Sequence, residues 1–230
     1  MQAVILAGGL GTRLRPLTHQ IPKVMVLIKE KPFLEYILEL LKRNNLKKIV
    51  LCAGYLGEKI ENYFGNGKKW GMDIKYSFEK EKGLLGTGGA LKNAELLLEN
   101  EFIVLYGDTF LNINYQDLIS YFYKQGKLGV MAAFTNQSKT MLNNIEVNKK
   151  NEIINYDKKK EEKANCVDAG VLVFKKDILK LIPSNKKVSL EEEIFPILIQ
   201  KKEMSAYSTN QRFYDIGTFE QLKQFNNQII

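Results

Sequence analysis

The 230-residue sequence is poor in cysteine and histidine and has no long apolar run. Its two cysteines, Cys52 and Cys166, stand in separate apolar segments without the close spacing of metal ligands, so we expect buried free thiols. No stretch reaches the roughly 18 apolar residues of a membrane span. The apolar segment 3–7 is too short for the core of a secretory signal. We therefore expect a cytoplasmic protein with no membrane association.

The sequence also lacks a patch typical of nucleic-acid binding. Its formal charge of +8 fits either anionic substrates or a general bias toward lysine. The longest lysine-rich run, residues 156–165, is interrupted by acids and contains no aromatic residue beyond Tyr156. We expect no nucleic-acid partner.

The first half of the chain alternates strand and helix patterns. Continuous apolar runs predict buried strands, and apolar residues at helical spacing predict amphipathic helices. The expected strands are residues 3–7, 47–55, 72–78 and 102–108, and the expected helices 32–44, 58–64 and 88–100. This order favours an α/β fold with a parallel sheet covered by helices on both faces.

After about residue 126 the pattern changes to strands without long helices between them. The expected strands are residues 127–135, 144–148, 152–157 and 167–174, followed by a helix over 189–202, two short strands within 205–216 and a last helix over 218–228. No internal repeat or linker divides the chain. We predict one α/β domain, 1–230, with a Rossmann-like, mixed but mostly parallel central sheet, in which the added strands of the second half form a second wall.

The segment AGGLGTRL, residues 7–14, is compared with three kinds of glycine-rich binding loop. A dinucleotide-binding loop is excluded because Leu14 occupies its third glycine position and the second strand has no acid at its end. The GxxxxGK[ST] loop of NTPases does not occur. A glycine-rich turn followed by Arg13, Arg15 and Lys23 remains, and it suits a polyphosphate. A purely structural turn with surface arginines is the alternative.

The same segment, LAGGLGTRLRPLT followed by PKVM, closely resembles the signature of the sugar-1-phosphate nucleotidylyltransferases. The resemblance continues through LGTGGA (85–90), YGD (106–108), YDK (156–158), DAGVLVF (168–174) and DIGT (215–218), so it covers essentially the whole chain. It implies a GT-A-like nucleotidyltransferase fold. The nucleotide-binding half would be about 1–125 and the sugar-phosphate-binding half about 126–230.

The resemblance assigns most of the glycine-rich segment to the NTP. It implies that Arg13 contacts the triphosphate and that Lys23 binds the phosphate of the sugar. Val24 departs from the pattern, because the family usually has a second proline there to stiffen the loop. The nucleotide-binding residues that it implies are Leu6, Gly8, Gly9, Gly11, Thr12, Arg13, Glu79, Gly86 and Thr87.

Two distant aspartates are the candidate metal ligands. Asp108 follows the strand FIVLYG, and Asp215 ends the short strand FYD. Each alone is typical of a turn, but the resemblance pairs them as ligands of Mg²⁺, which takes one or two carboxylates together with phosphate oxygens. Asp108 is followed by Thr109-Phe110, so the Asp-x-Asp string of metal-dependent glycosyltransferases is not present.

The implied reaction is attack by a sugar-1-phosphate oxygen on the α-phosphorus of an NTP, with release of pyrophosphate. The attacking phosphate is already an anion, because its second pKa is about 6, so no general base is required. The single histidine, His19, is accordingly expected to be an exposed loop residue. The expected catalytic residues are Arg13, Lys23 and Asp108.

The string LGTGGA is similar to that of guanylyltransferases that use mannose or heptose phosphates. A carboxylate at Glu79 would suit the N–H donors of guanine, so the expected NTP is GTP. Taken alone, residues 79–91 equally fit a flexible loop with a helix start at Thr87. The family resemblance places a sugar-phosphate site at Asp157, Lys158, Asp168 and Gly170, although Asp157 and Asp168 depart from its usual Glu and Asn.

The segment SLEEEIFP, residues 189–196, is similar to that of the D-glycero-α-D-manno-heptose 1-phosphate guanylyltransferases. Taken alone, its Glu191–Glu193 run is typical of a solvated first turn of a helix, and Ser189 with Glu192 has the spacing of a capping box.

Several alternative functions remain compatible with the sequence. Within the family they are mannose-1-phosphate guanylyltransferase, glucose-1-phosphate thymidylyltransferase and a muramic-type uridylyltransferase. In another class, the chain would be a non-catalytic regulator that binds a nucleotide sugar. No additional C-terminal domain is expected after residue 222, and the oligomeric state is open, a homo-oligomer included.

Overall fold

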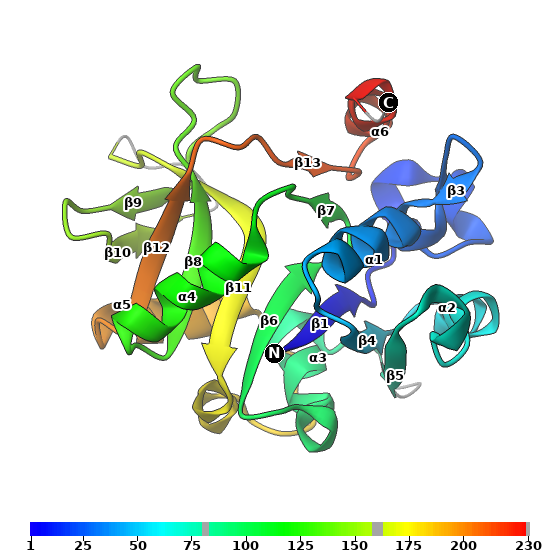
Figure 1. Ribbon diagram of the computed structural model, residues 1–230, viewed down its shortest axis with the longest axis horizontal. Helices are drawn as coiled ribbons and strands as arrows, with labels where there is room; N and C mark the ends of the chain where they lie inside the picture. The colour runs from blue at the N-terminus through cyan, green and yellow to red at the C-terminus, as the bar shows by residue number, and fades with distance from the viewer. Residues whose placement is uncertain (80–82, 158–162, 229–230) are drawn as a thin grey trace.

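A seven-stranded mixed sheet forms the centre of the protein (Figure 1). The computed structural model describes residues 1–79, 83–157 and 163–228. Strands β1, β4, β5 and β6 run parallel to one another, and so do β8 and β12, while β11 is antiparallel to both of its neighbours. The strand order is β12 (Met204–Thr209), β8 (Gly129–Phe134), β11 (Val167–Lys175), β6 (Glu101–Tyr106), β1 (Gln2–Ala7), β4 (Lys48–Ala53) and β5 (Asp73–Phe78).

Helices cover both faces of this sheet, as the alternation of strand and helix patterns predicts. On one face, residues of α1 (Phe33–Arg43), α2 (Gly57–Phe64) and α4 (Tyr115–Gln125) pack in one apolar cluster. On the other face, α3 (Gly86–Asn93) and α5 (Phe195–Gln200) belong to a second cluster. In β1, Ala3 and Ile5 face the first cluster and Val4 the second, each with no exposed surface. A strand that is buried on both faces must be apolar throughout, which explains its continuous apolar run.

The predicted α/β class and the mixed, mostly parallel sheet are confirmed, but several elements differ from expectation. Helix α4 has no counterpart in the prediction. The helix expected over 88–100 begins at Gly86 and ends at Asn93, and a 3₁₀ turn, Glu95–Leu97, follows it. Of the strands of the second half, β8, β11 and β12 extend the central sheet, and β9 and β10 pair in a separate two-stranded sheet.

The helix expected over 189–202 begins as a π-helical turn, Leu190–Ile194, and continues as α5. The Ser189 hydroxyl accepts a hydrogen bond from the Glu192 amide at 3.2 Å, as the capping-box spacing predicts. The Ser189 amide in turn donates a hydrogen bond to the carboxylate of Glu193, not to that of Glu192, at 2.8 Å. The wider π turn brings the side chain one residue later back to the start of the helix.

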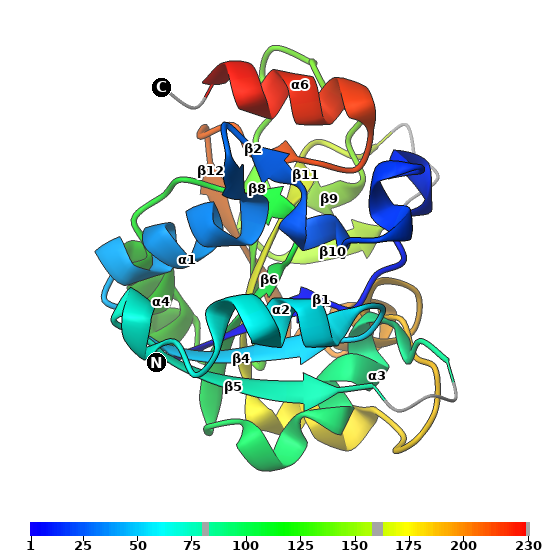
Figure 2. The same ribbon diagram turned by 90° about the vertical axis from the view of Figure 1, so that its right-hand side faces the viewer.

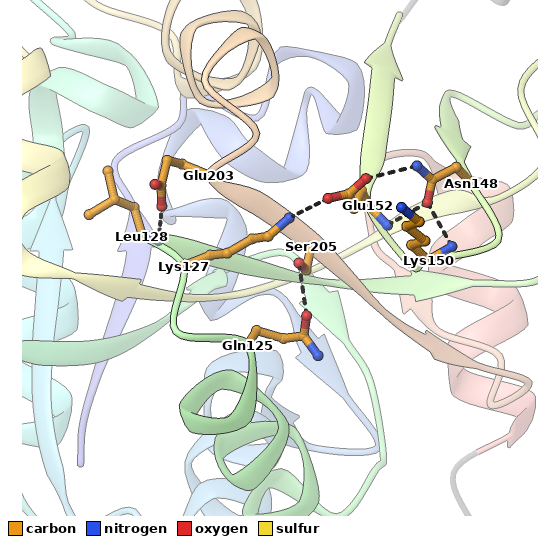
Figure 3. A network of polar contacts seen from close by, with 8 residues as sticks. All are labelled: Gln125, Lys127, Leu128, Asn148, Lys150, Glu152, Glu203 and Ser205. Carbon is orange, nitrogen blue, oxygen red and sulfur yellow. Dashed lines mark hydrogen bonds and ion pairs between the residues drawn. The ribbon is translucent and has the colours of Figure 1, made fainter.

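A hairpin of β9 (Ile145–Val147) and β10 (Ile153–Tyr156) lies beside β12 (Figure 1). Figure 3 shows how polar contacts anchor it. Glu152 forms an ion pair with Lys127 at 3.1 Å and accepts a hydrogen bond from the Asn148 side chain at 3.0 Å. Glu152 also pairs with Ser205 of β12 through a β-bridge. The hairpin is thereby fixed to the sheet and carries Tyr156 and Asp157 at its end.

A short antiparallel ladder joins β7 (Thr109–Phe110) to β13 (Tyr214–Asp215), with Asp215 opposite Thr109. The last helix, α6 (Phe219–Gln228), follows β13 directly and lies above it in Figure 1; Figure 2 shows α6 lengthwise. Two two-residue strands, β2 (Leu27–Ile28) and β3 (Lys31–Pro32), precede α1. The ladder brings segments that are more than 100 residues apart in sequence to one place.

Both cysteines are buried and free, and His19 is exposed, as predicted. Among the described residues, no helix is long and apolar enough to cross a membrane.

Candidate active site

A cavity of about 440 Å³ opens at the carboxyl ends of β1 and β6, which is where open α/β sheets bind ligands. Nine of the residues expected to bind substrates line it: Leu6, Gly8, Gly9, Arg13, Lys23, Glu79, Gly86, Thr87 and Asp108. Six further residues complete its wall: Ala7, Val24, Leu84, Ala90, Tyr106 and Glu191.

Two cationic side chains, Arg13 and Lys23, line this cavity. Lys23 begins a 3₁₀ turn, Lys23–Met25, in which the Val26 amide donates to the Lys23 carbonyl at 3.2 Å. Val24, where the family usually has proline, is 3% exposed and packs toward Gly107. The turn is therefore held by its own hydrogen bonds and by burial of Val24. The Lys23 ammonium forms an ion pair with the Asp108 carboxylate.

Asp108 and Asp215 converge across the β7–β13 ladder. The amide of Ile216, next to Asp215, donates to the Asp108 carbonyl at 3.0 Å. A side chain built on Gly217 would lie 3.0 Å from a guanidinium nitrogen of Arg13 and 3.2 Å from Oδ1 of Asp215. Arg13 therefore reaches the loop that carries Asp215. Three segments far apart in the sequence thus meet at one site.

Asp215 is held by two hydrogen bonds. Its Oδ1 accepts from the Gly217 amide at 3.0 Å, and its Oδ2 accepts from the side-chain amide of Gln221 at 2.9 Å. Burial raises the pKa of Asp215, and the negative charge of Asp108 raises it further, against the lowering effects of Gly217, Lys23 and Arg13. The two carboxylates repel each other, and a cation bound between them would relieve this repulsion.

The two carboxylates are oxygen ligands of the kind that Mg²⁺ takes, but they do not form a complete protein site. Among residues 1–79, 83–157 and 163–228, no three His, Cys, Asp or Glu side chains cluster as metal ligands. Mg²⁺ commonly uses one or two carboxylates, with substrate phosphates and water as its other ligands. Two aspartates beside Arg13 and Lys23 match that donor set better than they match a metal site built by protein alone.

Glu79 lines the cavity too, and its carboxylate lies close to Gly8. Its Oε2 accepts a hydrogen bond from the Leu85 amide at 2.6 Å. Burial raises the pKa of Glu79, although the hydrogen bond from Leu85 opposes this effect. A side chain at position 8 would collide with the carboxylate, so Gly8 makes room for Glu79.

The glycines of the LGTGGA segment pack closely against residues 186–188. A Cβ atom on Gly86 would lie 2.6 Å from the Val188 carbonyl oxygen, and one on Gly89 would lie 2.6 Å from the Lys186 carbonyl oxygen. The Gly88 and Gly89 amides donate to the Val188 carbonyl at 2.9 and 3.2 Å. These glycines therefore join α3 to the segment before the π turn, while Gly86 also lines the cavity.

We expect Gly86→Ala to destabilise the fold more than Gly126→Ala. Both glycines have positive φ, at 72° and 68°, so alanine is strained at either position. Among the residues that the structure describes, the new methyl group would meet backbone atoms at Gly86, whereas no atom lies within 4 Å of it at Gly126. The difference in unfolding free energy should be about 1–3 kcal/mol, measured by urea denaturation. Equal losses for the two variants would contradict this account of Gly86.

Glu191 differs from expectation, because it is not solvated. It is 8% exposed and lines the cavity, whereas Glu192 and Glu193 are exposed. The π turn directs Glu191 inward, where its Oε2 accepts hydrogen bonds from Thr87 at 2.8 Å and Ser189 at 2.7 Å. A run of three glutamates in a first turn therefore separates into one buried and two solvated side chains.

Of the residues expected to bind the sugar phosphate, Lys23 lines this cavity, whereas Asp157, Asp168 and Gly170 do not. Asp168 is 9% exposed; its Oδ2 accepts from the Tyr156 hydroxyl at 3.2 Å and its Oδ1 from the Gly170 amide at 2.9 Å. Gly170 has φ of 72° at an irregularity in the β11–β8 pairing and packs against Thr109. Asp157 is partly exposed, and its amide donates to the Asn144 carbonyl at 2.8 Å. Lys158 lies outside the described residues.

Two predicted nucleotide residues lie outside the cavity wall as well. Gly11 has φ of 60° and packs against Thr18 and Lys23, so its immediate role is to let the loop turn beside the lysine. Thr12 is exposed at the start of a 3₁₀ turn, Thr12–Leu14. Asp215 lines a neighbouring cavity of about 530 Å³.

Sequence reasoning missed three residues of the site: Tyr106, Glu191 and Gln221. Tyr106 stands two residues before Asp108 at the end of β6 and lines the cavity, and this position could have flagged it. Burial and the charges of Asp168 and Glu191 raise its pKa, so it stays protonated. Glu191 and Gln221 carry no local signal. Glu191 accepts a hydrogen bond from Thr87, which is distant in sequence, and Gln221 donates to Asp215 across the turn that precedes α6.

The fold and the site define a nucleotidyltransferase. The chain belongs to the nucleotidyl transferase family, which it matches over residues 2–230. The resemblance drawn from its motifs is thereby confirmed.

Among its relatives, the chain is 36% identical to the D-glycero-alpha-D-manno-heptose 1-phosphate guanylyltransferase of Campylobacter jejuni, and the match covers 98% of each chain. It is 30% identical to the enzyme of the same name from Aneurinibacillus thermoaerophilus, over 94% of this chain and 93% of the relative. Among solved structures it is similar to HddC from Yersinia pseudotuberculosis, with 27% identity and a TM-score of 0.83 over 100% of this chain and 99% of the other; HddC has also been solved in complex with GMP-PN.

Proposed function

We propose that the protein transfers a guanylyl group from GTP to D-glycero-α-D-manno-heptose 1-phosphate, forming GDP-heptose and pyrophosphate. The observation that carries the proposal is the meeting of Arg13, Lys23 and Asp108 at one cavity, with Asp215 close enough to feel their charges, in a chain whose full-length relatives include heptose 1-phosphate guanylyltransferases. A non-catalytic regulator would not need this set of phosphate-binding and metal-binding groups together.

The proposed roles follow from charge and position. Arg13 would contact the triphosphate, because its guanidinium can donate several hydrogen bonds to phosphate oxygens. Lys23 would hold the sugar phosphate and, beside Asp108, bring it to the α-phosphorus. Holding two anions together in the correct orientation and stabilising the charge on the α-phosphate are then the main catalytic tasks.

Asp108 and Asp215 are the residues that would hold Mg²⁺. When bound, this ion neutralises phosphate charge in the substrate complex. The neighbouring carboxylates, the phosphates and water supply suitable oxygen ligands.

A substrate panel tests the proposal directly. GTP, ATP, UTP and dTTP are each combined with glucose, mannose and D-glycero-D-manno-heptose 1-phosphates, and pyrophosphate release is measured in the presence of Mg²⁺. We expect the highest kcat/KM for GTP with the heptose 1-phosphate. Preference for mannose 1-phosphate would replace the proposed acceptor, and absence of pyrophosphate with every pair would favour the regulator.

A further inference from the structure

Glu191 connects the nucleotide-binding loop to the second half of the chain. It belongs to the π turn and is 104 residues from Thr87, yet its Oε2 accepts a hydrogen bond from the Thr87 hydroxyl at 2.8 Å. The Ser189 hydroxyl donates to the same oxygen at 2.7 Å. Although burial opposes ionisation of Glu191, these hydroxyls lower its pKa, so Glu191 remains a carboxylate at neutral pH.

The contacts of Thr87 fix the direction in which its hydroxyl can act. A threonine hydroxyl has one proton to donate and two lone pairs with which to accept. The proton is donated to Glu191, and one lone pair accepts the Leu190 amide at 2.9 Å. The remaining lone pair can only accept a hydrogen bond. Thr87 therefore presents an acceptor at the wall of the cavity.

Glu79 adds a second acceptor in the same cavity wall. The Leu85 amide donates to Glu79 at 2.6 Å, and Leu85 lies two residues from Thr87, so the two acceptors are carried by one short segment and its anchor. Guanine offers N–H donors at N1 and N2, whereas the corresponding edge of adenine has an acceptor at N1 and no amino group at C2. A pair of acceptors complements guanine and repels adenine.

We propose that Glu191 is a positioning residue for base selection: by accepting the hydrogen bond that the Thr87 hydroxyl donates, it leaves Thr87 able only to accept from the donor edge of guanine. The inference rests on the proposed function, and it names the residue that sets the enzyme's preference for GTP. Glu191 does not contact the base in this arrangement. It acts through Thr87.

The test measures nucleotide binding without turnover. Dissociation constants of GTP and ATP are determined by isothermal titration calorimetry with Mg²⁺ and no sugar 1-phosphate. In Glu191→Met the Thr87 hydroxyl loses its acceptor, so it can rotate and donate a hydrogen bond to the base. We expect GTP to bind more weakly and ATP more tightly, so that the GTP preference falls about tenfold. A general loosening of the cavity would weaken both nucleotides together, and this result would overturn the inference.

Two matched variants sharpen the comparison. Glu191→Gln keeps an oxygen that can accept the Thr87 proton, so the GTP preference should stay within about threefold of the original. Glu192→Gln changes the exposed neighbour and should alter neither constant. If Glu191→Met does not fold, Thr87→Val and Thr87→Ser replace it: valine should lose the preference and serine should keep it, and equal preferences in the two would overturn the inference.

The inference and the proposed function can fail separately. A wild-type chain that binds GTP better than ATP but releases no pyrophosphate with any sugar 1-phosphate would refute catalysis, and base selection through Glu191 would still be measured by binding. A wild-type chain without GTP preference would overturn the inference and the choice of GTP together.

Discussion

Asp108→Asn is expected to lower kcat about 10³-fold, which corresponds to about 4 kcal/mol of transition-state stabilisation. Asparagine has nearly the same shape, so the β6–β7 turn should be retained. It removes the negative charge that pairs with Lys23 and faces Asp215. Because the charge on the phosphates is greatest during transfer, GTP affinity should change much less, by no more than about tenfold. The two quantities are measured by pyrophosphate release and by calorimetry.

Asp73→Asn is the matched control for this variant. Asp73 is an exposed aspartate at the amino end of β5, so the same chemical change is made at the opposite edge of the sheet. Its kcat should equal that of the unmodified protein. Normal turnover of Asp108→Asn with Mg²⁺ would refute the assignment of Asp108 to the metal.

Lys23→Ala is expected to raise the KM for the sugar 1-phosphate about 30-fold and the KM for GTP less than about threefold. Loss of a charge-assisted hydrogen bond to a phosphate costs about 2 kcal/mol, and only the ligand that meets Lys23 should lose it. The ion pair with Asp108 adds a second effect, because Asp108 and Asp215 then repel each other without a neighbouring ammonium group. We therefore also expect a lower kcat. Both constants are obtained from initial rates of pyrophosphate release.

Lys48→Ala controls for loss of positive charge in general. Lys48 is exposed at the amino end of β4 and pairs with Glu99 at 2.7 Å, away from the cavity. Neither KM should change. If Lys23→Ala instead weakened GTP alone, Lys23 would belong to the triphosphate site and the proposed sugar-phosphate role would be wrong.

Much of the fold could be predicted because burial on both faces of a sheet demands continuous apolar strands. The runs of β1, β4 and β6 show this pattern directly. Helix α4 was missed, although Asn114 caps it by accepting from the Gln116 amide at 3.0 Å and Gly126 ends it in a left-handed conformation. Those boundary signals were present in the sequence. The extension of the central sheet by β8, β11 and β12 has no comparable local signal, because strand pairing is decided by contacts distant in sequence.

The candidate site divides in the same way. Gly8, Arg13, Lys23 and Asp108 stand in long motifs whose residue types suit phosphate and metal chemistry, and the structure brings them to one cavity. Glu191 could not be separated from Glu192 by sequence, because only the π turn decides which glutamate is buried. The hold of Gln221 on Asp215 likewise depends on the turn between β13 and α6.

The sequence by itself determined the class of fold, the family and the chemical types available for catalysis, since apolar periodicity and motif residues are local properties of the chain. Only the tertiary structure decided which groups share a charge environment. Asp108, Asp215 and Arg13 meet through the β7–β13 ladder and the loop after it, and Thr87 meets Glu191 across 104 residues. Electrostatic and hydrogen-bond energies depend on distance in space, which the order of residues does not specify.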